Sequence, residues 1–264
     1  MRKIKFTKLV ASGNDFVLIE KAQIKIPDSK LPELARNICD RKLGIGADGL
    51  LVLGKSAKAS ARMRIFNADG SEAEMCGNGA RCVVFYLQGR GPIETKAGII
   101  DAKINNSNIQ IKLTDPRDIK LDLPVKVGKR QIRVNYLDTG VPHAVVFVQG
   151  IDKINVFELG RQIRYHQKFS PRGTNVDFVE VLSKDAIRVR TYERGVEDET
   201  LACGTGSTAS AIAFALKSGA KNKVSVLTQS KEVLTVYFNR VNNKINNVWL
   251  EGRARIVYQG EYYV

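Results

Sequence analysis

Short apolar runs separated by polar or glycine-rich turns dominate this chain, and this pattern predicts many strands and few helices. Some runs alternate apolar and polar residues, as at 61–66, and others are continuously apolar, as at 50–53. The expected strands are 4–10, 16–20, 50–53, 61–66, 93–104, 108–113, 131–137, 144–148, 178–181, 186–192, a hairpin near 223–239, 248–250 and 254–258. The fold is therefore expected to be rich in sheet.

Four stretches have the spacing of helices instead. Residues 31–40 repeat apolar side chains every three or four positions, and 80–88 and 151–166 are also expected to be helical. The helix expected at 207–217 is small and apolar nearly all round and is stopped by Gly219. Such a helix is typical of one enclosed by a sheet.

Two of these helices follow the same pattern, a cysteine that opens a glycine-rich loop. The loops are Cys76-Gly77-Asn78-Gly79 and Cys203-Gly204-Thr205-Gly206. Each places a thiol at a helix N-terminus, where free amide hydrogens and the helix dipole favour negative charge. We therefore expect both thiols to have a lowered pKa and to be usable bases or nucleophiles.

The spacing of landmarks indicates an internal duplication. Gly13 and Gly140 are 127 residues apart, as are Cys76 and Cys203, and each glycine lies in a turn before an apolar strand. The fold class expected is α/β (α+β), with two pseudo-symmetric halves. A site between such halves would receive one thiol from each.

The charged segment 114–124, which contains two prolines, is the candidate crossing between the halves. The expected domains are 1–117, joined by the last strand at about 250–264, and 118–249.

Two facing thiols suit the inversion of a carbon acid. One thiolate removes the proton from one face, and one thiol delivers a proton to the other. The amides of the helix N-termini can hold the carboxylate of the substrate and stabilise charge as the carbanion forms. Because no pyridoxal-type lysine environment is recognisable, we expect no cofactor.

Composition narrows the class of protein further. The chain has 264 residues and is 44% hydrophobic and 26% charged, as expected of a packed globular protein. No apolar run is long enough for a membrane span, and the basic N-terminus lacks a signal-peptide core, so a cytoplasmic protein is expected. Four scattered cysteines and two histidines predict neither a disulfide scaffold nor a metal site.

The net charge of +15 raises the question of a nucleic-acid partner. The basic residues are spread along the whole chain, without a dense tract or an aromatic-interleaved patch. A lysine-rich, solvated surface is therefore favoured, and no nucleic-acid or membrane partner is expected.

Over nearly its full length the chain resembles diaminopimelate epimerases. The stretches that carry the resemblance are Gly13-Asn14-Asp15-Phe16, Cys39-Asp40-Arg41, Gly44-Ile45-Gly46-Ala47-Asp48-Gly49, Phe66-Asn67-Ala68-Asp69-Gly70-Ser71, Glu74-Met75-Cys76-Gly77-Asn78-Gly79-Ala80-Arg81, Glu94-Thr95-Lys96-Ala97-Gly98, Asn175-Val176-Asp177-Phe178-Val179-Glu180, Glu193-Arg194-Gly195 and Leu201-Ala202-Cys203-Gly204-Thr205-Gly206. Together these stretches are highly specific, whereas any one alone is weak.

The resemblance implies two domains, each a sheet or barrel wrapped around a central helix. It also implies a homodimer that interconverts LL- and meso-diaminopimelate on the route to lysine and peptidoglycan. By matching motif, the acid/bases are Cys76 and Cys203, assisted by His143 and Glu193. The substrate-binding residues so implied are Asn14, Asn67, Gly77, Asn78, Asn175, Glu193, Arg194, Gly204 and Thr205.

Several alternatives stay open. Turn chemistry alone also accounts for Asn14, Asn67 and Asn175, and a packing role for His143; Glu193 and Arg194 could form a surface pair. Where the family usually has asparagine before the proline and histidine, this chain has Val141. A racemase of another amino acid on the same fold is therefore the nearest rival, and a basic nucleic-acid-binding protein a more distant one.

Overall fold

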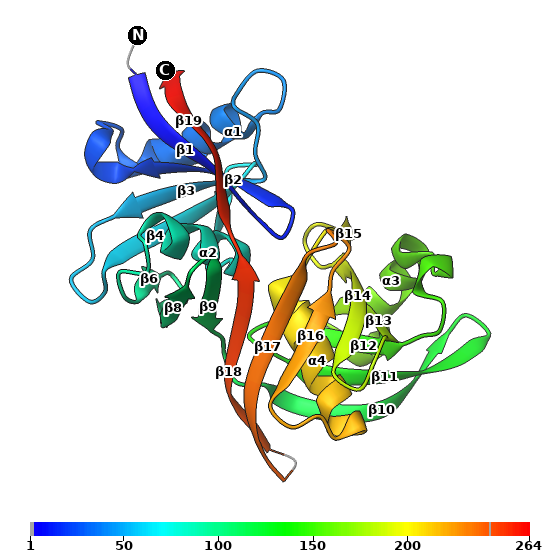
Figure 1. Ribbon diagram of the computed structural model, residues 1–264. Coiled ribbons are helices and arrows are strands. Elements are labelled where there is room, and N and C mark those ends of the chain that lie inside the picture. The colour runs from blue at the N-terminus through cyan, green and yellow to red at the C-terminus, as the bar shows by residue number, and fades with distance from the viewer. Residues whose placement is uncertain (1–2, 243) are drawn as a thin grey trace. The chain divides into compact units, whose positions relative to one another are not determined.

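The protein divides into two compact units in a computed structural model that describes residues 3–242 and 244–264 (Figure 1). Unit 1 comprises Met1–Ile111 with Gly252–Val264, and unit 2 comprises Lys112–Glu251. The boundaries expected from the sequence, 117/118 and about 249/250, differ from these by a few residues. That the halves are separate folding domains stays a prediction, to which we return in the Discussion.

Unit 1 contains a mixed sheet, two helices and a hairpin that lies outside that sheet. Its elements are β1 (Lys3–Ala11), β2 (Asn14–Glu20), α1 (Leu31–Cys39), β3 (Gly49–Gly54), β4 (Ala61–Asn67), β5 (Glu72–Ala73), α2 (Gly77–Tyr86), β6 (Ile93–Thr95), β7 (Gly98–Ile100), β8 (Ala102–Asn105), β9 (Asn108–Lys112) and β19 (Arg255–Tyr263), with short 3₁₀ turns at Lys21–Gln23 and Asp28–Lys30. The sheet order is β19-β1-β2-β3-β4-β6-β7, with β5 paired to β4, and β8 and β9 form a hairpin.

Unit 2 repeats this plan. Its elements are β10 (Arg117–Val127), β11 (Arg130–Asp138), β12 (Pro142–Phe147), α3 (Val156–Arg164), β13 (Asn175–Val181), β14 (Ala186–Glu193), β15 (Asp198–Thr200), α4 (Gly204–Ser218), β16 (Lys223–Leu227), β17 (Val233–Val241) and β18 (Lys244–Arg253), with 3₁₀ turns at Ile151–Lys153 and Gln167–Phe169. Its strands follow the order β10-β11-β12-β13-β14-β16-β17-β18, with β15 paired to β14.

The strand directions confirm the duplication. In unit 1, β2 runs parallel to β3 and β4 parallel to β6, while β1–β2, β3–β4 and β6–β7 are antiparallel. In unit 2, β12–β13 and β14–β16 are parallel, while β11–β12, β13–β14 and β16–β17 are antiparallel. A helix connects the two strands of each parallel pair. These helices are α1 and α2 in unit 1 and α3 and α4 in unit 2. The expected fold class, two homologous α+β halves, is confirmed.

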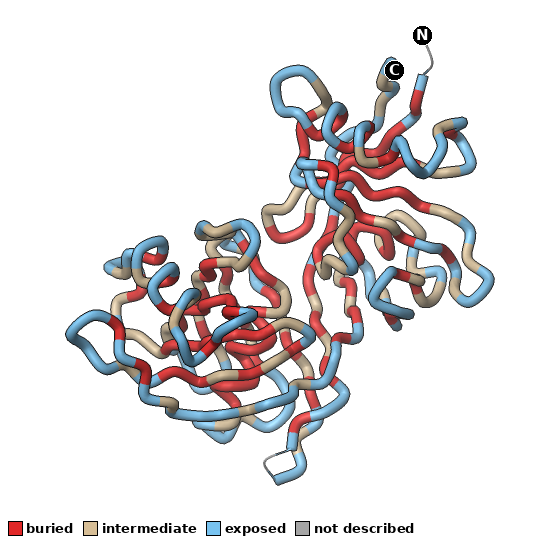
Figure 2. Tube along the Cα trace, turned by 180° about the vertical axis from the view of Figure 1, so that it is seen from behind, coloured by how far each residue is buried: buried red, intermediate tan, exposed pale blue. Residues whose placement is uncertain are grey.

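Strand alternation places a helix on each face of each sheet. In unit 1, Val17, Leu50 and Val52 share an apolar cluster with residues of α1, and in unit 2 Val176 and Phe178 share one with residues of α3. The neighbouring strand positions face the other side, where α2 and α4 lie. Buried residues follow the strands and these helices in both units (Figure 2).

The helix α4 is enclosed as expected. Every residue from Gly206 to Ala215 is buried, and Figure 1 shows α4 running behind β16 and β17. Gly219 ends the helix in a left-handed conformation (φ 83°), and its N–H donates to the Ala215 carbonyl at 3.0 Å. Small side chains along this helix allow strands to approach it on all sides.

Both cysteine helices begin earlier than expected. The sequence predicted starts at Ala80 and Ser207, whereas α2 begins at Gly77 and α4 at Gly204. The cysteine itself caps each helix, so the glycines belong to the first turn and not to a preceding loop.

Two other expectations were wrong in extent. The helix expected over 151–166 is shorter, because Asn155 accepts the Glu158 N–H at 3.1 Å and caps a helix that begins at Val156. The strand expected over 93–104 is divided into β6, β7 and β8, since the chain reverses through Lys96 and Ala97 and Gly98 (φ 124°) pairs with Thr95.

The segment expected as a crossing is mostly strand. β10 covers Arg117–Val127 at the edge of the sheet, and Pro124 lies opposite Arg133. An edge strand tolerates proline because one side of its backbone needs no partner. Asp118 and Asp122 have positive φ at the two irregularities of its pairing, which hid the strand pattern in the sequence.

Candidate active site

Each cysteine of the two loops is the N-cap of its helix. Cys76 has an extended backbone, and its Sγ accepts the N–H of Gly79 at 3.5 Å. Cys203 is likewise extended, and its Sγ accepts the N–H of Gly206 at 3.4 Å. Serine or threonine usually fills this position. Here the acceptor is sulfur, so a reactive group stands beside the first-turn amides.

Those first-turn amides suit an anionic substrate group. The first four N–H groups of a helix have no partner within it, and the dipole adds positive character at this end. In α2 they include Gly77 and Asn78, and in α4 Gly204 and Thr205. We call each cysteine N-cap with the first turn of its helix a half-site. Each half-site therefore has a set of backbone amides that can hold a carboxylate.

The expectation of a lowered thiol pKa is wrong for Cys203. Only 8% of this residue is exposed, and burial raises the pKa of its thiol well above the usual value. The nearby carboxyls of Glu193 and Asp177 act in the same direction, while the hydrogen bonds of Thr205 and Gly206 oppose them more weakly. Desolvation outweighs the helix N-terminus, so Cys203 is held as the protonated thiol.

In unit 1, Asn14 and Asn78 lie together. The Asn78 amide donates to Asn14 Oδ1, and Asn14 Nδ2 donates to Asp48 Oδ2 at 3.0 Å. The buried Arg81 donates to Asn78 Oδ1 at 2.6 Å and to Ser12 Oγ at 2.8 Å. These contacts fix the orientation of both amides beside the Cys76 helix.

A cluster of charged residues lies next to the side-chain amides of Asn14 and Asn78. Asp15 contacts the buried Lys8 at 2.7 Å and Arg41 at 2.8 Å, and Arg41 also reaches Asp48 at 2.7 Å. Burial opposes ionisation of Asp15, but its hydrogen bonds to Arg41 and Lys8 outweigh burial and lower its pKa to about 2. Asp48 joins the cluster to Asn14. The pattern of charges in the sequence did not predict that Lys8, Asp15, Arg41 or Asp48 would lie at the site.

Asn67 lies in the turn after β4. Its amide donates to Ser71 Oγ at 2.9 Å, and its N–H donates to the Ser71 carbonyl at 2.8 Å. Turn chemistry accounts for these contacts, so a role for Asn67 in substrate binding stays a prediction.

In unit 2, His143 is fully buried and joins several expected residues. Its Nε2 lies 3.0 Å from Thr205 Oγ1 and 3.4 Å from Asn175 Nδ2, and Thr205 Oγ1 lies 3.3 Å from Cys203 Sγ. Asn175 Oδ1 accepts the N–H of Arg194 at 2.7 Å. His143, Asn175, Thr205 and Cys203 therefore form one connected group.

Glu193 and Arg194 have separate surroundings. Burial raises the pKa of Glu193, although neighbouring Thr200 and His143 favour its ionised form. The Arg194 guanidinium donates to the carbonyl of Arg172 at 3.1 Å. A carboxyl with a raised pKa beside Cys203 suits proton transfer better than a surface ion pair.

One buried carboxylate was missed in the sequence. Asp177 is fully buried, and its Oδ2 lies 2.7 Å from His143 Nδ1. Its position next to Val176 and Phe178 on a strand gave a signal, because an acidic residue on a strand with both faces buried needs a polar partner.

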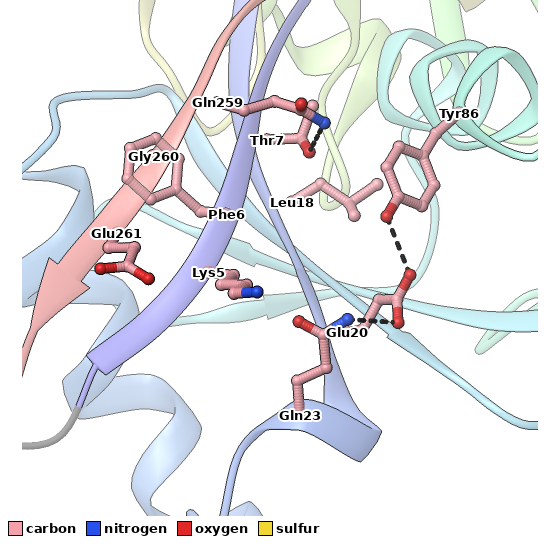
Figure 3. Close-up of a pocket in the computed structure, with 10 residues that line it drawn as sticks. All are labelled: Lys5, Phe6, Thr7, Leu18, Glu20, Gln23, Tyr86, Gln259, Gly260 and Glu261. Carbon is pink, nitrogen blue, oxygen red and sulfur yellow. Dashed lines mark hydrogen bonds between the residues drawn. The ribbon is translucent and has the colours of Figure 1, made fainter.

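Unit 1 also has a cavity of about 390 Å³ at the other end of α2. Figure 3 shows Tyr86 and Gln23 turned toward Glu20, which accepts from each at 2.8 Å. Burial and Glu20 raise the pKa of Tyr86 to about 12. The lining residues include neither cysteine of the two loops, so the expected chemistry does not belong to this cavity.

The described residues include no helix that is long and apolar enough to cross a membrane.

Comparisons with solved structures agree on the fold. A PhzF-family phenazine biosynthesis protein from Bacillus anthracis superposes with a TM-score of 0.78 at 19% identity, and the match covers 100% of both chains. A hydroxyproline epimerase from Agrobacterium vitis superposes with a TM-score of 0.69 at 17% identity, covering 99% of this chain and 91% of that one.

The sequence has much nearer relatives. Diaminopimelate epimerase of Aquifex aeolicus is 44% identical, with 97% of each chain covered, and that of Methanocella arvoryzae is 40% identical, with 99% of this chain and 97% of the relative covered. The diaminopimelate epimerase family model matches residues 6–118 and 135–257. With both cysteine half-sites inside the matched ranges, the chain belongs to the diaminopimelate epimerase family.

Proposed function

We propose that this protein is an epimerase that interconverts LL-2,6-diaminopimelate and meso-2,6-diaminopimelate without a cofactor. The observation that carries the proposal is the repeated cysteine N-cap, one in each unit of a chain of this family. The matched relatives carry this enzyme's name, which supplies the substrate.

The reaction needs a base and an acid on opposite faces of one carbon. A thiolate removes the α-proton, the carbanion forms, and the thiol of the other cysteine delivers its proton. Cys203, held protonated by burial, has the state required of the donor. In the reverse direction, the two cysteines exchange these parts.

The surrounding groups divide the remaining work. First-turn amides hold the reacting carboxylate, so negative charge that develops at the α-carbon is stabilised where it forms. His143 and Glu193 assist proton transfer at the Cys203 end. The proposed substrate-binding residues are Asn14, Asn67, Gly77, Asn78, Asn175, Glu193, Arg194, Gly204 and Thr205.

Incubation with LL-diaminopimelate in deuterated water tests the activity. We expect meso product and deuterium at the α-carbon, because the proton delivered comes from a solvent-exchanged thiol. If neither appears with purified protein, the proposal is wrong. Exchange on other amino acids, without exchange on diaminopimelate, would instead favour a racemase whose substrate is set by Val141 and its neighbours.

Cysteine variants test the two-base scheme. We expect Cys76→Ala and Cys203→Ala each to lower kcat by roughly 10³-fold or more, since each loses an acid/base group. Cys39→Ala is the matched control; burial raises the pKa of the Cys39 thiol to about 11, and its loss should leave activity within about twofold. Near-normal activity in either of the first two variants would contradict the scheme.

We further propose a cytoplasmic homodimer without a nucleic-acid or membrane partner. The resemblance to the family supports the dimer, and light scattering should give twice the chain mass of 29.2 kDa. A mass of one chain would contradict the dimer. Altered mobility of duplex or single-stranded probes at low salt would contradict the absence of a nucleic-acid partner.

A further inference from the structure

A buried polar cluster lies behind the Cys203 loop. Asp177 has no exposed surface. Its Oδ2 lies 2.7 Å from His143 Nδ1, and its Oδ1 accepts a hydrogen bond from the Thr191 hydroxyl at 2.7 Å. A Cβ at Gly206, whose N–H donates to Cys203, would overlap Asp177 Oδ1. The carboxylate therefore packs directly against the first turn of the helix that Cys203 caps.

The matching positions of unit 1 are apolar. Leu51 pairs with Leu18 and Ile65 as Asp177 pairs with Val145 and Thr191. A Cβ at Gly79 would meet Leu51 and Ile65, as one at Gly206 meets Asp177. Leu51 and Ile65 are thus the unit 1 counterparts of Asp177 and Thr191.

By the same alignment, Phe16 is the unit 1 counterpart of His143. In unit 1, Phe16 pairs with Gly49 at the start of β3, and in unit 2 His143 pairs with Asn175 at the start of β13. Three positions that hold phenylalanine, leucine and isoleucine behind Cys76 hold histidine, aspartate and threonine behind Cys203. The duplicated scaffold folds with hydrocarbon at these positions, so packing alone does not require the polar set.

The hydrogen bonds around His143 select one tautomer. A carboxylate is an acceptor only, so the contact with Asp177 places the proton on Nδ1. Asn175 presents its NH₂ to Nε2, because its oxygen already accepts the Arg194 N–H. Nε2 is therefore the unprotonated nitrogen, and it faces the Thr205 hydroxyl.

We propose that Asp177 is a positioning residue that holds His143 with a basic Nε2 toward Thr205, so that the Cys203 thiol can pass its proton inward through the Thr205 hydroxyl. This rests on the proposed function in that the thiol is an acid/base. The S–H proton moves to Thr205 Oγ as the Thr205 proton moves to His143 Nε2. The products are a thiolate and an imidazolium, and Asp177 stays ionised throughout.

The charges around these groups favour transfer of the proton from Cys203 toward His143. Asp177 and Glu193 are the acidic groups that act on Cys203, and both also face His143. Thr205 and Asn175 are neutral. A buried imidazolium is stabilised by such carboxylates, whereas the apolar counterparts behind Cys76 offer no such proton acceptor. The two half-sites thus differ in how their thiols are deprotonated.

The tautomer of His143 can be measured in the unmodified protein without substrate. The chain has two histidines, and His166 serves as internal reference, since its Nδ1 accepts the Lys168 N–H at 3.2 Å and so favours the opposite tautomer. Long-range ¹H–¹⁵N spectra, assigned with His166→Gln, should show Nδ1–H for His143 and Nε2–H for His166. An Nε2–H tautomer at His143 would overturn the proposal, whether or not the protein is an epimerase.

Asp177→Asn tests the consequence for turnover. Loss of the negative charge behind the imidazolium should lower kcat by about 10²–10⁴-fold and leave KM within about threefold. Asp185→Asn, the same change in an exposed turn of unit 2, is the control and should have no effect. A folded Asp177→Asn protein with normal kcat, or with only KM raised, would refute the assignment; if this variant does not fold, the tautomer measurement decides alone.

Discussion

Asp15 shows how a single residue serves the site without touching substrate. It is half-buried, yet ionised, because Lys8 and Arg41 face it from two sides. Lys8 is itself almost fully buried, and its ammonium group contacts both Asp15 and the Gly46 carbonyl. Removal of the carboxylate would leave a buried charge uncompensated, a costly change in most proteins.

Asp15→Asn should therefore destabilise the protein in a pH-dependent way. The folded pKa of about 2 lies below the ordinary value of 3.8, so ionised Asp15 adds stability above pH 4, and this stability is lost as the pH falls toward 2. Because solvent screens this half-buried group, we expect the ion pairs to contribute about 1–2 kcal/mol at neutral pH, less than the full pKa difference would give. Urea unfolding of both proteins at pH 7 and pH 2.5 measures it.

The control for this comparison is Glu33→Gln. Glu33 pairs with Lys30 on the surface at 2.8 Å, and solvent screens such an exposed pair, so its loss should leave stability nearly unchanged at both pH values. A loss in Asp15→Asn that is equal at both pH values would show that the ion pairs do not set the stability of this cluster.

At the scale of elements, the sequence predicted best where its signal was local. The spacing of α1 and the small residues and Gly219 of α4 identified those helices within a few residues. The first turns of α2 and α4 were missed for two reasons. Glycine is a poor helix former, and cysteine is not among the residues that usually cap a helix. The edge strand β10 was hidden by proline and two strained aspartates.

The two cysteine helices predict a matched pair of glycine variants. Gly206→Ala drives a Cβ into the Asp177 carboxylate and should cost about 3 kcal/mol of unfolding free energy, the upper part of the range usual for overpacking, and most of the activity. In Gly79→Ala the new Cβ lies 3.1 Å from Leu51 Cδ2 and 3.4 Å from Ile65 Cδ1, whose side-chain ends can shift, and at an ordinary contact distance of 3.7 Å from Cys76 Cβ. Its helix propensity gain of about 1 kcal/mol offsets the crowding.

Unfolding curves and turnover of the two variants provide the comparison. Gly79→Ala should stay within about 1 kcal/mol of the parent protein. Equal losses in both would mean that the loops respond to crowding alone and that the Asp177 contact has no special weight.

At the scale of the molecule, a constant offset in the sequence predicted the duplication, and the strand directions bear it out. The difference between the half-sites could not be predicted in the same way. It depends on which face of a strand each residue occupies, and this follows from registers such as Leu51 with Ile65 and Asp177 with Thr191. The return of the last strand to unit 1 was expected from the sequence, and the pairing of β1 with β19 shows how that strand joins the sheet.

This pairing leads to a prediction about which parts fold alone. Residues 112–251 contain the complete core of unit 2 and should give a dispersed NMR spectrum as a fragment. Residues 1–111 should not, because without β19 the side chain of Phe6 loses Tyr258, packed edge-on at 5.8 Å, and β1 becomes a bare edge.

A permuted fragment makes the test decisive. Lys3 lies opposite Tyr263 in an antiparallel pair, so a short turn can join residue 264 to residue 1 and give a continuous chain of 252–264 followed by 1–111. This fragment should fold where 1–111 does not, and the difference should appear in NMR dispersion and in a cooperative urea transition. Each folded fragment alone should lack epimerase activity, since each holds one of the two cysteine N-caps. Cooperative folding of 1–111 by itself would show that β19 is dispensable and would refute the discontinuous domain.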